Sequence, residues 1–276
     1  DTPKHYDANC YLCPGNTRIS GDENPHYQAT YVFTNDFSAL QQEQFSATTP
    51  QHTLLRAEPA SGTSRVICYS PDHSLTMPQL SKGDIAAIID TWKSQASELG
   101  KNYRWVQIFE NKGAIMGCSQ PHPHGQIWAN DFLPTEVAKK DHNQREYFEK
   151  NDSNLLLDYV NIELAQNERI VYQNTNWTIV VPYWAAWPFE TMLLPKAHLA
   201  RLEDMSLDQH NDLADALKII TTIYDNVFSC SFPYSMGFHF APYEDTPDNQ
   251  TYWQLHASFY PPLLRSSSVR KFMVGY

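Results

Sequence analysis

The chain has 276 residues, which is long for one small domain and sufficient for two core-bearing units. Hydrophobic residues make up 42% and charged residues 18%, a composition that excludes a disordered protein. The net charge of −11 disfavours nucleic acid as a partner, because nucleic-acid binding needs a positive field, and no apolar run is long enough to predict a membrane span. A phosphate-bearing ligand would need a local basic patch, for which Arg270 and Lys271 are candidates.

Five cysteines are scattered along the chain, an odd number that does not suggest a disulfide framework. No secretion signal is recognisable, so we expect a reducing, cytoplasmic environment. Cys10 and Cys13 form a C-x-x-C pair, a spacing that lets two thiolates close on one tetrahedral zinc ion. A redox pair or two unrelated loop thiols are the alternatives, and Pro14 argues against the helix start that a redox motif needs.

A complete zinc site needs two more ligands, which must come from distant histidines. His73 and His122 are the best candidates. Ligation by two cysteines and two histidines leaves no open coordination position, so such a zinc would be structural and not catalytic.

Apolar residues recur at helical spacing in two stretches, residues 85–99 and 213–224. Ser81 and Asp84 form a candidate capping box before the first, and Ser206 is a candidate cap for the second. Strand-like runs, several of them alternating in polarity, surround the helices: Arg65–Ser70, Trp105–Glu110, Trp177–Val181, Thr191–Leu194 and Trp253–Phe259. Such alternation is typical of antiparallel sheets with one solvated face.

The order of these elements repeats along the chain. Each half contains strands, a long helix, a strand region with IMG (115–117) or SMG (235–237), and a histidine-containing strand that ends in an aromatic residue. We interpret this as a duplication of two α+β units, residues 1–136 and 137–276. The join falls in the polar stretch Val137–Asn154, where we expect a short helix.

Residues 117–128, GCSQPHPHGQIW, form the most specific pattern in the chain. Histidines at positions i and i+2 share one face of a strand, and Pro123 cannot donate to a sheet ladder, which predicts an edge or the start of a strand. Gly125 removes a side chain beside His124, which we interpret as room for a ligand. A second metal site or surface histidines are the alternatives for the H-x-H pair.

A neutral imidazole is a good nucleophile near pH 7, so His124 is the candidate nucleophile for attack on a nucleotide α-phosphorus. Gln126 offers a neutral amide that could hold a phosphoryl oxygen in the transition state. Gly117, Cys118 and Ser119 offer backbone N–H groups and a hydroxyl to the other phosphates. This combination predicts nucleotidyl transfer.

At this point the chain resembles the galactose-1-phosphate uridylyltransferases, a divergent and duplicated branch of the histidine-triad superfamily. The similarity covers nearly the whole chain and is carried by CYLCPGN (10–16), YVFTNDF (31–37), SRVICYSPDH (64–73), WVQIFENKGAIMGCSQPHPHGQIWAN (105–130), VVPYWAAWPFETMLLPKAH (180–198), YDNVFSCSFPYSMG (224–237), WQLHASFYPPLLRS (253–266) and VRKFMVGY (269–276). The resemblance implies a histidine-triad-like α+β fold.

The resemblance also implies roles for single residues. His124 would be the uridylylated histidine, with Gln126 and Ser119 at the phosphate. The implied nucleotide contacts are Asn35, Asp36, Phe37, Asn111, Gly117, Ser119 and Gln126, and the implied sugar-binding residues are Lys271, Phe272, Val274 and Tyr276. The implied zinc ligands, Cys10, Cys13, His73 and His122, are the set already suggested by the residues alone.

Many relatives hold a second metal, iron, with a glutamate and three histidines. Two of these histidines correspond to His239 and His256, but the third position is Ser258 and the glutamate position is Lys140. Because an ammonium group cannot be a metal ligand, we predict that this second site is lost.

The resemblance implies a ping-pong reaction in a homodimer. UDP-glucose uridylylates His124 and releases glucose 1-phosphate, and galactose 1-phosphate then takes the uridylyl group to give UDP-galactose. Relatives have a basic segment before the C-x-x-C pair and a tail after VGY, so we expect either a trimmed chain or impaired activity. Gln120, Phe238 and Phe240 also depart from the usual residues, with no predicted effect. The alternatives are a related nucleotide-sugar phosphorylase or hydrolase, and a nucleotide-sugar-binding homologue without catalysis.

Overall fold

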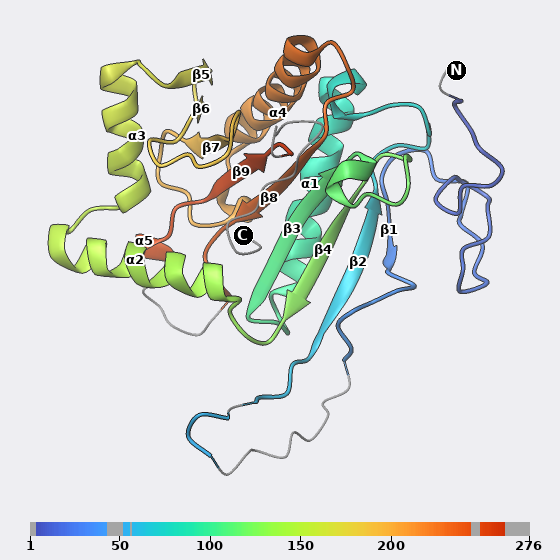
Figure 1. The fold of residues 1–276 in the computed structure, drawn as a ribbon, viewed down its shortest axis with the longest axis horizontal. Helices are drawn as coiled ribbons and strands as arrows, with labels where there is room; N and C mark the ends of the chain where they lie inside the picture. The colour runs from blue at the N-terminus through green and yellow to red at the C-terminus, as the bar shows by residue number, and fades with distance from the viewer. Residues whose placement is uncertain (1–3, 43–51, 56, 244–248, 263–276) are drawn as a thin grey trace, which may run out of the picture.

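A computed structural model describes residues 4–42, 52–55, 57–243 and 249–262. Within these residues, nine strands form one antiparallel sheet in the order β1-β2-β4-β3-β8-β9-β7-β6-β5 (Figure 1). The strands are β1 Tyr31–Thr34, β2 Gly62–Cys68, β3 Trp105–Lys112, β4 His124–Asn130, β5 Ile170–Gln173, β6 Trp177–Val180, β7 Thr191–Pro195, β8 Tyr234–His239 and β9 His256–Tyr260.

The helices are α1 Lys82–Leu99, α2 Thr135–Asn151, α3 Leu155–Gln166, α4 Leu207–Phe228 and α5 Asn249–Tyr252, with short 3-10 turns η1 Met77–Gln79, η2 Ala114–Met116 and η3 Leu202–Asp204. The expected α+β class, with antiparallel strands and flanking helices, is confirmed. Among the described residues, no helix combines the length and the apolar character needed to cross a bilayer.

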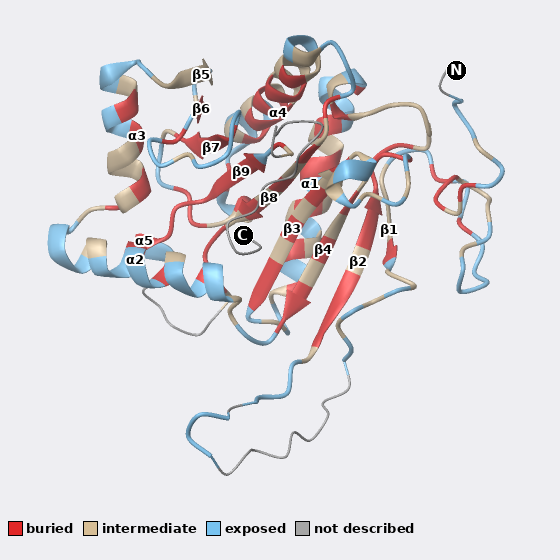
Figure 2. Cartoon of the chain, viewed as in Figure 1, coloured by how far each residue is buried: buried red, intermediate tan, exposed pale blue. Residues whose placement is uncertain are grey.

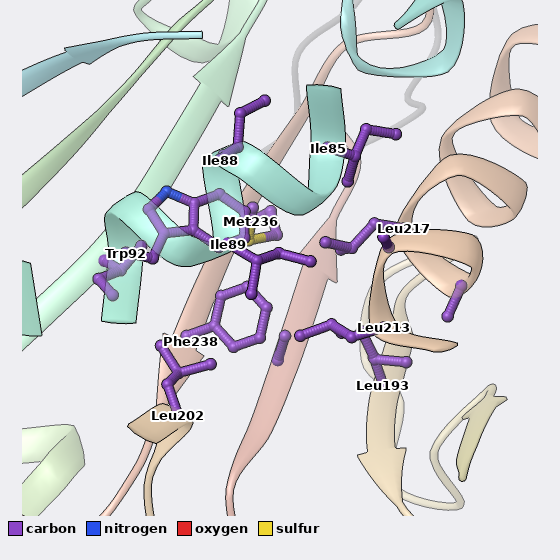
Figure 3. Close-up of a cluster of buried hydrophobic side chains, with 14 of the residues drawn as sticks. Ile85, Ile88, Ile89, Trp92, Leu193, Leu202, Leu213, Leu217, Met236 and Phe238 are labelled. Atoms are coloured by element: carbon purple, nitrogen blue, oxygen red, sulfur yellow. The ribbon is translucent and has the colours of Figure 1, made fainter. Parts of the chain in front are cut away.

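The two long helices form where the apolar stripes predicted them. The Ser81 hydroxyl accepts from the Asp84 N–H at 3.1 Å, and the Ser206 hydroxyl accepts from the Gln209 N–H at 3.2 Å, so both helices begin with a capping box. Helices α1 and α4 lie side by side on one face of the sheet (Figure 1). Figure 3 shows how Ile89 of α1 and Leu213 of α4 meet side chains of the strands in one shared core.

The opposite face of the sheet is covered at both ends by other parts of the chain. At one end, the N-terminal loop with Cys10 and Cys13 packs on Val66 of β2. At the other end, Leu156 and Val160 of α3 pack on strands β6 and β7. The candidate active site lies beside the N-terminal cover, where β4 begins.

The strand order is palindromic about the β3–β8 pair: β1-β2-β4-β3 on one side is matched by β6-β7-β9-β8 on the other. Strands β3 and β8 pair from Ile108↔Phe238 to Lys112↔Tyr234, so the two halves share one sheet. The proposed match between IMG and SMG was wrong, because residues 115–117 lie in and after η2, whereas residues 235–237 lie inside β8.

Three further expectations are corrected. The join holds one helix, as expected, but this helix, α2, is 17 residues long and not short, and α3 follows after the join at Leu155. Helix α2 is mainly exposed (Figure 2), and its buried residues include Asp141, which accepts from the Tyr252 hydroxyl at 2.8 Å and the Trp253 indole N–H at 2.7 Å. Strand β2 begins at Gly62 and ends at Cys68. Strand β9 begins at His256, because the N–H groups of residues 253–255 donate to α5, α2 and Leu199 and not to a neighbouring strand.

Candidate active site and metal centre

The histidine strand, β4, lies inside the sheet between β2 and β3. Pro123 immediately precedes it, so the prediction of a strand start is confirmed and the alternative of an edge strand is wrong. His122 lies outside β4 and is buried, whereas His124 is its first residue and is partly exposed. The two histidines therefore face different surroundings.

His124 has a fixed ring orientation. Its Nδ1 lies 2.7 Å from the backbone carbonyl oxygen of His122, so Nδ1 carries the proton and Nε2 keeps a free lone pair. Burial lowers the pKa of His124, and the hydrogen bond to His122 partly opposes that effect. The result is a neutral imidazole near pH 7, the form that a nucleophile requires.

Gly125 does not provide room for a ligand, contrary to the interpretation from the sequence. A Cβ atom placed there would lie 2.1 Å from the Tyr69 hydroxyl oxygen, and Tyr69 belongs to the core shared with α1. Gly125 is therefore required by the close packing of Tyr69 behind the histidine strand.

Two cavities meet at His124. One, of about 170 Å³, is lined by Asn35, Asp36, Phe37, Ser119, Gln120, His124 and Gln126, together with Tyr11, Leu12, Phe33 and Val66. The other, of about 230 Å³, includes Asn111, Ser119 and His124 in its lining. The structure thus brings together residues from the turn after β1, from β3 and β4, and from the loop between β3 and β4 around the candidate nucleophile: Asn35, Asp36, Phe37, Asn111, Ser119 and Gln126.

Two amide side chains in these cavities have their oxygen atoms occupied. The Trp128 indole N–H donates to Gln126 Oε1 at 3.1 Å, and the Ser235 hydroxyl donates to Asn111 Oδ1 at 2.6 Å. Both amides can therefore present their NH₂ ends to an anionic ligand. Sequence reasoning missed both partners. Trp128 could have been found from its i+2 spacing to Gln126, whereas Ser235 is recognisable only once β8 is paired with β3.

The loop after β3 offers fewer free donors than expected. Gly113 and Gly117 have φ angles of 90° and 84°, values that favour glycine. The Gly117 N–H donates to the Ala114 carbonyl at 3.0 Å, and the Cys118 N–H donates to the Gly113 carbonyl at 3.3 Å. These two N–H groups are used inside the loop, which leaves the Ser119 hydroxyl as the clearest donor there.

Asp36 is held by a cation that the sequence reasoning did not single out. Arg18 forms an ion pair with it at 3.2 Å and stacks over the Phe33 ring at 4.4 Å. Both charged side chains are about one-tenth exposed, at 9% and 10%. This arrangement fixes the Asp36 carboxylate at the cavity wall.

The four predicted metal ligands gather in one cluster: Cys10, Cys13, His73 and His122. Cys13 Sγ lies 3.5 Å from His73 Nδ1 and 3.6 Å from His122 Nδ1, and the two Nδ1 atoms are 3.4 Å apart. A tetrahedral ion with bonds typical of zinc separates sulfur from nitrogen by about 3.6 Å and two nitrogens by about 3.4 Å. The donor atoms therefore fit a single tetrahedral metal ion.

A second layer of contacts orients the His122 ring for that role. Its Nε2–H donates to the Ser70 carbonyl at 2.9 Å, and the Tyr27 hydroxyl oxygen lies 3.1 Å from the same nitrogen. Nδ1 is therefore the atom left for the metal. Burial lowers the pKa of His122 to about 4, so the ring is neutral.

The corresponding region of the second half contains no such cluster among the described residues. Lys140 Nζ lies 3.0 Å from His256 Nε2, and the His256 ring stacks on His239 at a centroid distance of 5.3 Å. The Ser258 hydroxyl and His239 Nδ1 are buried without a hydrogen-bond partner in the described residues. Burial lowers the pKa of Lys140 to about 8.

The remaining predicted residues divide into two groups. Lys271, Phe272, Val274 and Tyr276, with Arg270, lie outside the described residues. Of the unusual residues, Phe238 packs on Trp92 at 5.2 Å between ring centroids, and Phe240 stacks on Trp105 at 5.7 Å, so both fill the interior. The backbone carbonyl oxygen of Gln120 accepts from the Cys118 thiol at 2.9 Å.

Comparison with known proteins assigns the chain to a family. Family models for the N-terminal and C-terminal domains of galactose-1-phosphate uridyl transferase match residues 1–134 and 139–276. A galactose-1-phosphate uridylyltransferase of Haemophilus influenzae is 59% identical over 98% of this chain and 77% of its own length. The enzyme of that name from Rattus norvegicus is 48% identical over 99% of this chain and 72% of its own length.

Solved structures agree with this assignment. One described as a uridylyltransferase has a TM-score of 0.80 at 28% identity, covering 93% of this chain and 81% of that one. An ADP-glucose phosphorylase from Arabidopsis thaliana shares the fold, with a TM-score of 0.76 at 22% identity over 98% of this chain and 85% of that one. The chain belongs to the galactose-1-phosphate uridylyltransferase family, whose members are nucleotidyltransferase enzymes.

Proposed function

We propose that this chain transfers a uridylyl group from UDP-glucose to galactose 1-phosphate through a covalent intermediate on His124. The observation that carries the mechanism is the bond from His124 Nδ1–H to the His122 carbonyl at 2.7 Å, because it leaves Nε2 as the free nucleophilic atom beside two cavities. Nε2 attacks the α-phosphorus, the bond to the bridging oxygen breaks, and glucose 1-phosphate leaves. A phosphate oxygen of galactose 1-phosphate then attacks the same phosphorus, the P–N bond breaks, and UDP-galactose leaves. Ping-pong kinetics follow from this sequence.

The surrounding side chains supply binding and charge stabilisation. Gln126 and Ser119 donate to the non-bridging phosphoryl oxygens, whose negative charge grows in the transition state. Asn35, Asp36 and Phe37 line the cavity on the nucleoside side, where the carboxylate suits ribose hydroxyl groups. Asn111 contacts a phosphate. Gly117 has no side chain and lies beside open space, so a ligand can approach its backbone closely.

The metal in the Cys₂His₂ cluster is zinc in this proposal, and it is structural. Zinc is favoured because two thiolates and two imidazoles in a tetrahedral arrangement are its preferred ligands. When bound, it supplies folding free energy and no open coordination position. His122 links this cluster to the catalytic strand, since it precedes His124 by two residues and provides the carbonyl that orients it.

The second, iron-type site is lost in this proposal. The Lys140 ammonium group occupies the space beside His256 and would repel a cation. We also propose a cytoplasmic homodimer whose halves, residues 1–136 and 137–276, arose by duplication, with Lys271, Phe272, Val274 and Tyr276 contacting the sugar. The palindromic strand order supports the duplication.

Intact-mass measurement tests the reaction. Incubation with UDP-glucose should add one uridylyl mass, and galactose 1-phosphate should then remove it with formation of UDP-galactose. His124→Gly should take up no label while keeping the fold. Removal of the label by water or inorganic phosphate alone would instead identify a hydrolase or phosphorylase, and the absence of any label on the wild-type chain would identify a binding protein.

A further inference from the structure

Trp128 and Gln126 lie on the same face of β4, two residues apart. The Trp128 Nε1 atom is 3.1 Å from Gln126 Oε1. An indole N–H is a donor and never an acceptor, so only the oxygen end of the amide can face it. Contact with Trp128 therefore distinguishes the two ends of the Gln126 amide, which are nearly identical in shape.

The opposite end of this amide is free. Gln126 lines the cavity of about 170 Å³ together with Ser119 and His124. Within the described part of the chain, Gln126 Nε2 donates to no hydrogen-bond acceptor. The NH₂ group is thus available to an anionic ligand in the cavity that His124 faces.

Trp128 is well placed to act as a rigid anchor. It sits in a strand paired on both sides, opposite Gln107 of β3 and Ser64 of β2. Its ring packs edge-on against Phe109, with centroids 5.8 Å apart and an interplanar angle of 78°. The indole position is therefore set by the sheet and does not depend on a bound ligand.

We propose that Trp128 is a positioning residue for nucleotidyl transfer, which holds the Gln126 amide with its NH₂ group toward the reacting phosphate. Without the indole N–H, the amide can rotate by half a turn and present its carbonyl oxygen to the phosphoryl oxygens, where two acceptors repel. This inference rests on the proposed function of His124 and Gln126, and it adds a residue that does not touch the substrate.

Replacement of Trp128 by Phe removes the N–H while keeping an aromatic ring against Phe109. We expect the single-turnover rate constant for uridylylation of His124 by UDP-glucose to fall about two- to tenfold, the usual range for one neutral hydrogen bond. Half-saturation by UDP-glucose should change less, because the amide acts on charge that develops in the transition state. Incorporation of benzothienylalanine at position 128 keeps the bicyclic shape without an N–H. This protein should show the same fall in the uridylylation rate constant, and it provides the test if Trp128→Phe folds poorly.

Trp177→Phe is a matched control, because the Trp177 indole N–H donates to the Gln209 carbonyl at 2.8 Å, away from the cavity. It should leave the rate constant unchanged. In a Gln126→Ala background, loss of the Trp128 N–H should have no further effect on the rate. A full additional loss in that background, or wild-type rates for the benzothienylalanine protein, would overturn the inference. Failure of the proposed function would differ, since the wild-type chain would then take up no uridylyl group.

Discussion

Replacement of His122 by Asn should separate folding from catalysis more sharply than any other single change. The His122 Nδ1 atom lies 3.6 Å from Cys13 Sγ and 3.4 Å from His73 Nδ1, within the four-residue metal cluster. Its Nε2–H donates to the buried Ser70 carbonyl. The substitution therefore removes both one metal ligand and one buried hydrogen bond.

The expected size of the effect follows from these two losses. Outer-shell changes alone cost about 10- to 100-fold in metal affinity, so loss of a ligand should cost at least about 100-fold, which lowers the free energy of unfolding by about 2.7 kcal/mol. The unpaired carbonyl of Ser70 adds about 1 kcal/mol. At about 2–4 °C per kcal/mol for a chain of this size, the melting temperature should fall by about 7–15 °C.

Thermal melting and metal content should be measured for His122→Asn and for His124→Asn as the matched variant. Among the described residues, the His124 ring makes one hydrogen bond, to the His122 carbonyl, so its replacement should abolish uridylylation with a much smaller shift in melting temperature and full metal content. A chelator should destabilise the wild type and His124→Asn, and have less effect on His122→Asn. Equal melting temperatures and equal metal content for the two variants would refute this division of roles.

Three other outcomes are expected. Gly125→Ala should lower the free energy of unfolding by about 1–3 kcal/mol, because the added methyl group overpacks the core. Tyr69→Phe should recover part of this loss in the double variant, since the clash is with the Tyr69 hydroxyl, and thermal denaturation of the wild type, the two single variants and the double variant checks this. Burial lowers the pKa of Lys140 from 10.5 to about 8, so between these pH values the unfolded chain binds more protons than the folded chain. The free energy of unfolding should therefore rise with pH between about 8 and 10.5, and urea titrations of Lys140→Met should show a smaller rise. Ser235→Ala should reduce kcat/KM about two- to tenfold by releasing the Asn111 amide, with Ser235→Thr retaining more activity than the alanine variant.

The parts of the fold that sequence reasoning predicted are those in which apolar spacing and capping coincide. Helices α1 and α4 have both signals, and their buried residues, such as Ile85 and Leu213, are those of the apolar stripes. Helix α2 was underestimated because it is anchored mainly by polar residues: Asp141 and Gln144 are buried beside Val137, and no apolar period reveals such contacts. Helix α3 was not predicted, because its buried face is short: Leu156, Val160 and Glu163 are its buried residues, and one of these is charged.

The candidate site was predictable where its residues are close in sequence or share a chemical type. The Cys and His ligands were found because two thiols and two imidazoles suit one ion, and the structure does bring them together. Gly125 was misread because its neighbour, Tyr69, comes from a segment that no local pattern connects to it. Ser235 was missed for the same reason, since its partner Asn111 lies across the β3–β8 junction.

A comparison of His124 with His256 shows why one of two similarly placed histidines is better suited to the proposed reaction. His256 begins β9 as His124 begins β4, and its Nδ1 lies 2.9 Å from the Gln254 carbonyl two residues earlier, the same contact that orients His124. Both rings therefore carry the proton on Nδ1 and have a lone pair on Nε2. In the second half that lone pair accepts from Lys140 Nζ at 3.0 Å, and His256 is 1% exposed although it also lines a cavity, of about 310 Å³. In the first half it borders two cavities. Nucleophilicity in this fold is thus decided by what meets Nε2: both histidines border a cavity, but among the described residues the His256 lone pair is taken by an ammonium group and the His124 lone pair is not.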